Sequence, residues 1–189
     1  WPGIICNDAG SVTEILLPGY GIQDDLTNFS FSSFPNLVRL DLSENKLHGA
    51  IPHQIGALSK LTYLNLSSNH LRGELPSSLV NLTQLAEFRV SNNIIEGFIP
   101  SFIGNLTNLV TLYLRYNNFW GYIPPTLGQL SNLNSLDLSN NHFSGTIPSA
   151  LFNLTNLSRL DIHMNTAMGG FLSEEIGNLK SLVELDLSY

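Results

Sequence analysis

Residues 37–58 read L-V-R-L-D-L-S-E-N-K-L-H-G-A-I-P-H-Q-I-G-A-L, and the same phrase returns along the chain. Its first leucine recurs every 24 residues from Leu37 to Leu157, and Leu182 follows 25 residues later. One copy cannot bury its own apolar face, whereas stacked copies bury a continuous core. The repeat therefore predicts a right-handed solenoid of the α/β repeat class. Its parallel β-sheet lines the concave side, and short helical or 3₁₀ turns lie on the convex side.

The positions within one copy have separate physical roles. The alternating L-x-L segment predicts a short strand with apolar residues inward and polar residues outward. A recurring asparagine, Asn45 in this copy, follows the strand and is expected to satisfy backbone groups of its own and the next coil. Pro52 ends a second extended piece because proline offers no backbone donor. The predicted strands cover residues 37–42, 61–66, 85–90, 109–114, 133–138 and 157–162.

The repeat divides the whole chain, with no linker or second domain. We assign a partial amino-terminal cap to 1–11, a degenerate first repeat to 12–36, six repeats to 37–181 and an incomplete repeat to 182–189. The sixth repeat carries an extra residue, so Met168, Gly170 and Leu172 are expected to take shifted places.

Composition argues against several classes of function. The net charge of −7 makes nucleic acid a poor partner, and no run of 18 apolar residues is present to span a membrane. No phosphate loop, H-E-x-x-H, paired-cysteine site or nucleophile elbow occurs, so we predict no catalytic, cofactor or metal site. The histidines fall in exposed repeat positions without metal spacing: His48, His53, His70, His142 and His163.

The L-x-G-x-I-P segment resembles the plant-specific type of leucine-rich repeat. W-P-G-I-I-C-N-D-A-G-S-V-T-E-I (1–15) is similar to the amino-terminal cap of plant receptor-like kinase ectodomains. The wording S-V-T-E-I … F-S-S-F-P-N-L-V-R-L-D-L-S is similar to a subfamily that perceives small secreted peptides. The chain departs from that pattern by lacking the first cap cysteine and by stopping inside a repeat, so it resembles a fragment or a truncated relative.

Cys6 is the one cysteine of the chain. A lone cysteine is most often a small buried hydrophobe. In this context it resembles half of a cap disulfide whose partner would lie before Trp1, which makes Cys6 an odd cysteine in a secreted protein.

Two groups of residues depart from the bland repeat pattern. The exposed strand positions mostly carry Ser, Asn and Asp, but one predicted ligand-binding strip carries aromatic and charged residues: Glu87, Arg89, Tyr113, Arg115, Tyr116, Arg159 and His163, beside Met164. Tyrosine and arginine are enriched in binding hot spots, although exposed strands also tolerate tyrosine well. A secondary contact patch comprises Phe98, Trp120 and Tyr122, with Ile94 beside it. Such aromatics form a contact surface or only stack on one another and stiffen the solenoid.

The chain contains six N-x-S/T sequons, at Asn28, Asn65, Asn81, Asn105, Asn153 and Asn156. In a chain so rich in Asn, Ser and Thr, some sequons arise only from the repeat consensus and carry no glycan. Asn81, Asn105 and Asn153 share one back-side repeat position where a glycan fits, and we predict N-linked sugar there. Asn65 is expected to face the concave side.

These features favour a secreted or cell-surface recognition module that binds a peptide or protein, with no cofactor and no enzymatic activity. The resemblance implies part of a plant receptor-like kinase or receptor-like protein ectodomain, with a co-receptor as a further partner. One alternative is an inhibitor of cell-wall-degrading enzymes, because polygalacturonase inhibitors share this repeat. The other is a structural solenoid that stacks head to tail through its open ends.

Overall fold

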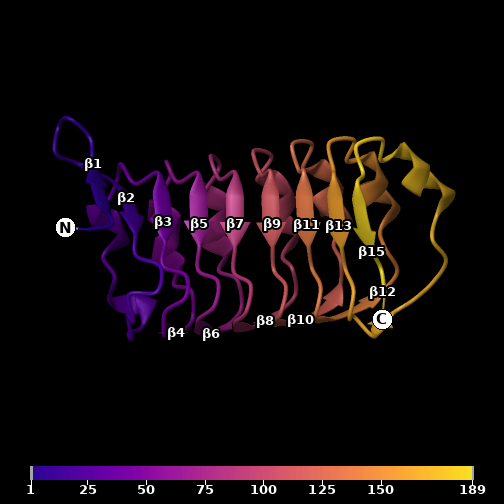
Figure 1. Ribbon diagram of the computed structural model, residues 1–189, viewed down its shortest axis with the longest axis horizontal. Helices are drawn as coiled ribbons and strands as arrows, with labels where there is room; N and C mark the ends of the chain where they lie inside the picture. The colour runs from indigo at the N-terminus through magenta and orange to yellow at the C-terminus, as the bar shows by residue number, and fades with distance from the viewer. Residues whose placement is uncertain (1, 189) are drawn as a thin grey trace.

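The alternating leucines form short strands whose central residue is buried. The computed structural model describes residues 2–188. Its larger sheet contains β1 (Ile4–Cys6), β2 (Val12–Leu16), β3 (Arg39–Asp41), β5 (Tyr63–Asn65), β7 (Glu87–Arg89), β9 (Thr111–Tyr113), β11 (Ser135–Asp137), β13 (Arg159–Asp161) and β15 (Glu184–Asp186). From β2 onward the neighbours pair in parallel, as predicted, and β1 pairs antiparallel with β2. Figure 1 shows this sheet running from one end of the molecule to the other.

The repeat strands are shorter than the six-residue ranges predicted from the sequence. In the second repeat, Leu61 still donates its backbone N–H to Leu58 of the preceding turn. At the other end, Ser68 has a φ of 56°, so the chain has already turned. These two turns leave only Tyr63–Asn65 in regular strand geometry.

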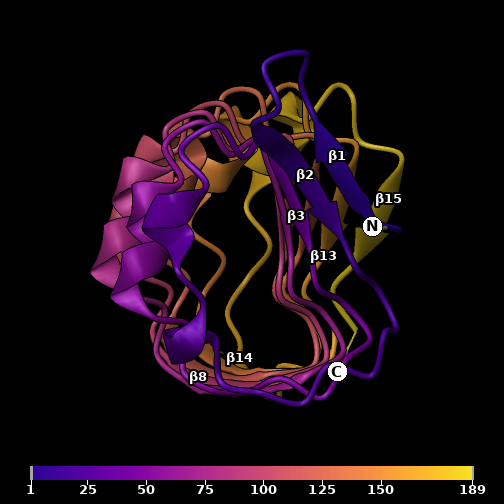
Figure 2. The same cartoon turned by 90° about the vertical axis from the view of Figure 1, so that its left-hand side faces the viewer.

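A second parallel sheet lies beside the first, and the sequence pattern indicated only an extended piece there. It contains β4 (His48–Gly49), β6 (His70–Gly73), β8 (Ile94–Gly97), β10 (Asn118–Tyr122), β12 (His142–Gly145) and β14 (Ala167–Met168), stacked in chain order. Figure 2 shows it as one wall of the coil, next to the larger sheet.

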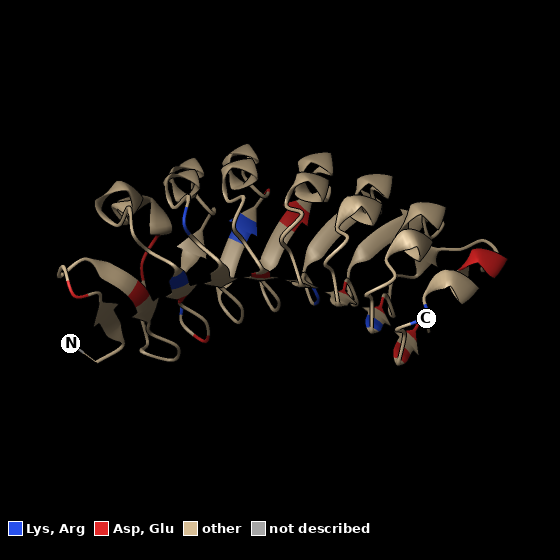
Figure 3. Ribbon diagram, turned by 90° about the horizontal axis from the view of Figure 1, so that it is seen from above, with Lys and Arg blue, Asp and Glu red and all other residues tan. Residues whose placement is uncertain are grey.

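The return segments form 3₁₀ helices, as predicted. They are η1 (Leu26–Asn28), η2 (Phe31–Ser33), η3 (His53–Ala57), η4 (Ser77–Asn81), η5 (Ser101–Asn105), η6 (Pro125–Gln129), η7 (Ser149–Asn153) and η8 (Glu174–Asn178). Figure 3 shows the solenoid as an arc, with these helices on the outer side and the larger sheet on the inner side. The larger sheet is therefore the concave surface.

The core runs the length of the coil between the two sheets and the helices. The leucines predicted to be buried are fully buried: Leu64, Leu66, Leu112, Leu114, Leu136 and Leu138. Phe31 fills the first repeat, and Phe29 and Phe34 pack against it from partly buried positions.

The predicted asparagine ladder is present, but its hydrogen bonds run to the preceding coil rather than to the next one. The amide nitrogen of Asn117 donates to the carbonyl oxygens of Leu114, at 3.1 Å, and of Val90 in the preceding repeat, at 2.9 Å. Its amide oxygen accepts the backbone N–H of Ile95 at 3.0 Å. One buried side chain thus closes its own turn and joins two adjacent coils.

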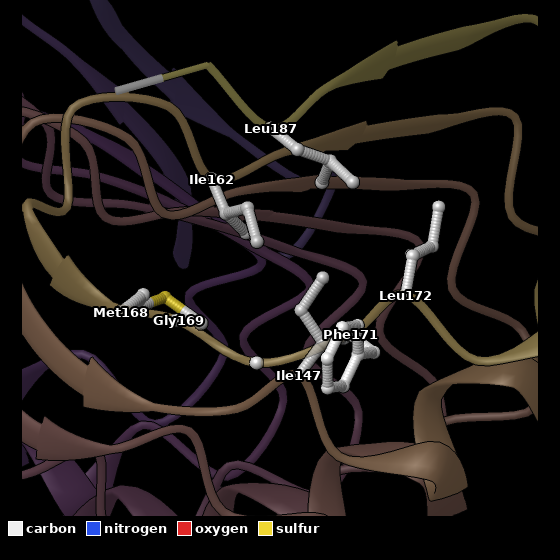
Figure 4. Close-up of a pocket in the computed structure, with 8 residues that line it drawn as sticks. Ile147, Ile162, Met168, Gly169, Phe171, Leu172 and Leu187 are labelled. Atoms are coloured by element: carbon white, nitrogen blue, oxygen red, sulfur yellow. The ribbon is translucent and has the colours of Figure 1, made fainter.

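The extra residue of the sixth repeat is absorbed after β13. Met168 is buried and pairs with Gly145, and Gly170 has a φ of 94° like the glycines before it. Leu172, in contrast, is half-exposed. Figure 4 shows Leu172 and Phe171 beside Ile147 and Leu187, around an apolar hollow at the C-terminal end of the coil.

Cys6 lies at the end of β1, in the hairpin at the opposite end of the coil. Its thiol is free and exposed, so the common interpretation of a lone cysteine as a buried hydrophobe is wrong for this chain.

Candidate functional site

Three residues of the predicted strip come together on adjacent strands of the concave sheet. Arg89 ends β7 and lies in register with Tyr113 at the end of β9. The guanidinium of Arg89 stands 5.0 Å from the centroid of the Tyr113 ring, and one of its amino groups lies 2.7 Å from the Glu87 carboxylate. Arg89 is therefore held by a cation–π contact and an ion pair, in a position where solvent still reaches it.

A buried carboxylate that the sequence analysis classed as bland extends this strip. Asp137 is in register with Tyr113 on β11 and almost fully buried. One carboxylate oxygen accepts the N–H and the hydroxyl of Ser139, while the other lies 3.9 Å from Arg115 and 3.7 Å from Arg159. Asp137 thereby links Arg115, just past β9, to Arg159 on β13, although 44 residues separate the two arginines.

Arg159 ties the strip to the last two strands. Its amino groups lie 2.9 Å from Asp161 on its own strand and 2.8 Å from Glu184 on β15. Burial alone would lower the pKa of Arg159, but the carboxylates of Glu184, Asp137 and Asp161 outweigh it and raise that pKa. The carboxylates around the Arg159 guanidinium therefore favour its charged form.

Tyr116 lies at the rim of the strip rather than on the sheet. β9 ends at Tyr113, three residues before it. Tyr116 follows in a left-handed turn with a φ of 52°, and its exposed ring lies 5.9 Å from the Arg115 guanidinium. Met164 occupies the same turn position two repeats later, with a φ of 55°.

His163 is partly buried and contacts groups of two neighbouring strands, whereas the sequence pattern predicted an exposed position. Its Nδ1 lies 2.6 Å from Asp161 and 3.8 Å from Asp186, and its Nε2 lies 3.0 Å from the amide nitrogen of Asn140. The hydrogen bond to Asp161 raises the pKa of His163 above its usual value, against the effect of burial. Asp186 comes 23 residues after His163, so no local spacing motif could reveal this group.

The N-terminal half of the concave face holds a second cation–π pair that the sequence analysis missed. Arg39 lies 4.5 Å from the ring centroid of Tyr63, whose hydroxyl donates to Asp41 at 3.1 Å. Burial, followed by the charge of Asp41, raises the pKa of Tyr63. Tyr63 occupies the strand position that Arg39 and Glu87 hold in the neighbouring repeats. An aromatic residue at this exposed position was the sequence signal for the pair.

An open hollow lies beside the Arg89–Tyr113 pair. The hydroxyl of Ser91 is buried inside it and has no hydrogen-bond partner among residues 2–188. Its rim includes side chains of the predicted strip together with amides and hydroxyls: Ser43, Glu44, Asn65, Ser67, Ser68, Arg89, Asn92, Tyr113 and Arg115. These amides, hydroxyls and charged groups offer a ligand hydrogen bonds and ion pairs beside the ring of Tyr113.

The secondary contact patch lies on the second sheet and forms a separate surface. The rings of Phe98 and Trp120 touch, with centroids 4.0 Å apart, while about half of each side chain stays exposed. Tyr122 and Ile94 are also exposed. The rings of Phe98 and Trp120 meet at an interplanar angle of 52°, so they are tilted rather than stacked, and a substantial apolar area still faces solvent.

The predicted back-side sequons share one structural position. Asn81, Asn105 and Asn153 each end a 3₁₀ helix on the convex side and are exposed. Asn28 and Asn156 are also exposed, and each donates a side-chain hydrogen bond. Asn65 lies half-buried on the concave sheet, where its amide contacts Asp41.

With this fold and surface described, the comparison with known families gives one clear assignment. The Leucine rich repeat family matches residues 21–71 and 83–143, which is more than half of the chain. The protein belongs to the leucine-rich repeat family.

Its curated relatives are plant receptor kinases. A probable leucine-rich repeat receptor-like protein kinase of Arabidopsis thaliana is 45% identical over 56 residues, which cover 30% of this chain and 5% of the kinase. The chain therefore matches only a small part of that relative's length. No helix within residues 2–188 is long and apolar enough to cross a membrane.

Two solved structures place the fold among receptor ectodomains. The ectodomain of the Arabidopsis thaliana receptor kinase GASSHO1/SCHENGEN3, in complex with CASPARIAN STRIP INTEGRITY FACTOR 2, is 34% identical with a TM-score of 0.88. The match covers 94% of this chain and 21% of that one. The Arabidopsis HAESA ectodomain, in complex with an extended IDA peptide hormone ligand, is 30% identical with a TM-score of 0.72; 96% of this chain and 39% of that chain align.

Proposed function

We propose that this chain is part of the extracellular ectodomain of a plant receptor-like kinase or receptor-like protein, and that its concave strip binds a secreted peptide or protein. The ectodomain fold of such kinases is typically a binding module. Its likeness to ectodomains in complex with a peptide hormone supports a peptide as the ligand. A related complex that includes the co-receptor SERK1 supports a co-receptor as a second partner.

The observation that carries the proposal is the side-chain network on the concave sheet. Arg89 and Tyr113 lie in register on two adjacent strands, and Arg115, just past the end of β9, lies 3.9 Å from the buried Asp137. In the neighbouring repeats the position of Tyr113 carries Asp137, and that of Arg115 carries Ser91 and Ser139. Arginine and tyrosine concentrate binding energy, and here ion pairs and cation–π contacts hold them before a ligand arrives.

A random peptide library displayed on phage and panned against the immobilised chain tests this proposal. Peptides that are enriched would be synthesised and titrated by calorimetry against the wild type and the Tyr113→Ala/Arg115→Ala variant. Loss of two hot-spot residues is expected to weaken binding by at least about 2 kcal/mol.

The control replaces two exposed aromatic residues of the secondary contact patch, Phe98→Ala/Tyr122→Ala. It should leave the affinity unchanged. If the control loses affinity and the concave variant does not, the site lies on the secondary contact patch instead. Inhibition of a purified fungal polygalacturonase by the chain, with no peptide enriched, would favour the inhibitor alternative.

A further inference from the structure

Three potential metal ligands meet at the C-terminal end of the concave sheet. Asp161 ends β13, His163 follows two residues later, and Asp186 ends β15 in register with Asp161. One ligand atom from each residue lies within 4.8 Å of the others. The shared centre is Nδ1 of His163, which lies 2.6 Å from Oδ1 of Asp161 and 3.8 Å from Oδ2 of Asp186.

Neighbouring groups hold each of these side chains by its other polar atom. The backbone N–H and hydroxyl of Ser188 donate to Oδ1 of Asp186, at 3.0 and 2.7 Å, which leaves Oδ2 toward the histidine. Arg159 donates to Oδ2 of Asp161 at 2.9 Å. The Asn140 amide lies 3.0 Å from Nε2 of His163. Such outer contacts orient the ligands of protein metal sites, and here the three inner atoms converge.

The local charge favours a divalent cation. Asp137, Asp161, Glu184 and Asp186 bring four carboxylates to this end of the sheet, and the guanidinium groups of Arg115 and Arg159 offset two of them. Two negative charges remain, which a divalent ion would balance.

We propose that Asp161, His163 and Asp186 bind a divalent first-row transition metal, with Zn²⁺ the best fit. An imidazole with carboxylates suits zinc, whereas Mg²⁺ and Ca²⁺ take oxygen ligands. With bonds of about 2.0–2.2 Å, two ligand atoms of a tetrahedral zinc ion lie roughly 3.3–3.6 Å apart. The observed separations of 2.6 and 3.8 Å lie on either side of that range. Small movements of the side chains therefore suffice.

Metal binding requires the ring proton to change nitrogen and one amide to turn. The proton that Nδ1 shares with Asp161 moves by way of solvent to Nε2, with no net change in the proton count, and Nδ1 can then donate its lone pair. With Nε2 protonated, the Asn140 amide presents its oxygen to it in place of its nitrogen. The side chains of His163 and Asp186 are partly exposed, at 28% and 44%, so the remaining coordination position opens to the concave face.

Calorimetric titration of the chain with ZnCl₂ near neutral pH tests the site. All proteins carry Cys6→Ser, because the exposed thiol of Cys6 would also bind zinc. The expected result is one Zn²⁺ per chain, with binding weakened at least about tenfold by His163→Ala and by Asp186→Asn. Asn140→Ala should weaken it by about tenfold or more through loss of the ring's orientation. The visible spectrum of the Co²⁺ form should show nitrogen and oxygen ligands at low coordination number, and His163→Ala should abolish it.

The matched control is His142→Ala, which removes an exposed histidine of β12 on the second sheet. It should bind zinc as the parent does. Circular dichroism and thermal unfolding verify that each variant is folded, and the partly exposed Asp186 makes Asp186→Asn the safer change. The absence of stoichiometric zinc binding, or zinc binding that both His163→Ala and Asp186→Asn leave unchanged, would overturn the proposal. Equal affinity for MgCl₂ would overturn the assignment to zinc.

Discussion

The edge of the Phe98 ring fills the space in which a side chain at Gly121 would begin. Gly121 has a φ of 79° and no side chain, so the Phe98 ring of the preceding repeat packs directly against its backbone. Tyr122 stands in the same relation to Gly145. Phe98 and Tyr122 of the secondary contact patch are therefore each positioned by the glycine of the next repeat.

Gly121→Ala is expected to destabilise the chain more than Gly73→Ala does. Both glycines have a φ near 75–79°, but a methyl at Gly73 would meet only Ala50, at 3.6 Å, whereas at Gly121 it would collide with Phe98. Overpacking of this kind costs about 1–3 kcal/mol beyond the backbone strain that both variants share. Denaturant unfolding of both variants measures the difference, and adding Phe98→Ala should recover much of it. Equal losses in the two glycine variants would mean that the ring moves away freely.

Leu112→Ala should lower the free energy of unfolding by about 2–5 kcal/mol. Leu112 is fully buried at the centre of β9, between Phe88 and Leu136 of the neighbouring strands. Its removal leaves a cavity that the stacked repeats cannot readily close. The control is Val110→Ala, which changes an exposed residue just before the strand. A loss below 1 kcal/mol for Leu112→Ala would contradict the rigid core.

Asn117→Ala is expected to cost about 1–3 kcal/mol, although it removes few apolar contacts. The change leaves the buried N–H of Ile95 without its acceptor, while the carbonyl of Val90 keeps the amide of Asn93 as a donor. Each buried group left unsatisfied costs about 1–3 kcal/mol. Asn118→Ala, at the exposed neighbouring position, should have almost no effect. Hydrogen exchange at Ile95 adds a local measure, because its amide should lose protection in the first variant only.

The repeat phrase was sufficient to predict the solenoid, since the period of Leu37 to Leu157 and the buried asparagines depend on local sequence alone. It was sufficient as well to find Arg89, Tyr113 and Arg115, because they break the bland pattern at exposed positions. It could not show the role of Asp137, whose identity is ordinary for the repeat and whose burial depends on the arginines around it. The grouping of His163 with Asp186 required the register between β13 and β15, which no spacing within one repeat contains.

N-linked sugar is predicted on Asn81, Asn105 and Asn153 when the chain is secreted from a eukaryotic host. These residues are exposed at the ends of η4, η5 and η7, away from the concave sheet. Intact mass before and after glycosidase treatment should fall by several glycans, and the triple Asn→Gln variant should lose most of that change. A mass unaffected by the glycosidase would rule the prediction out. Sugar on Asn65 would instead cover the concave site.

The final prediction concerns the apolar C-terminal end of the coil. Phe171 and Val183 are almost fully exposed there, and Leu172 and Leu185 are about half-exposed. On this end β15 is the last strand of the larger sheet among residues 2–188, so one side of its backbone lacks a neighbouring strand. Exposed apolar groups beside an unpaired strand edge promote association with another chain.

We therefore expect the purified 189-residue chain to associate with itself at high concentration, and Phe171→Ser/Val183→Lys to reduce that association. The substituted side chains are exposed, so the thermal midpoint should stay nearly unchanged. A contact between this end and the opposite end of a second chain would be heterologous, and without closure it would extend into filaments. Sedimentation velocity across a concentration series measures the size, and electron microscopy distinguishes filaments from closed particles. Ile94→Ser, which removes an exposed apolar residue from the second sheet, is the control and should leave association unaltered. A chain that remains monomeric at high concentration would show that the exposed apolar residues at this end do not drive self-association.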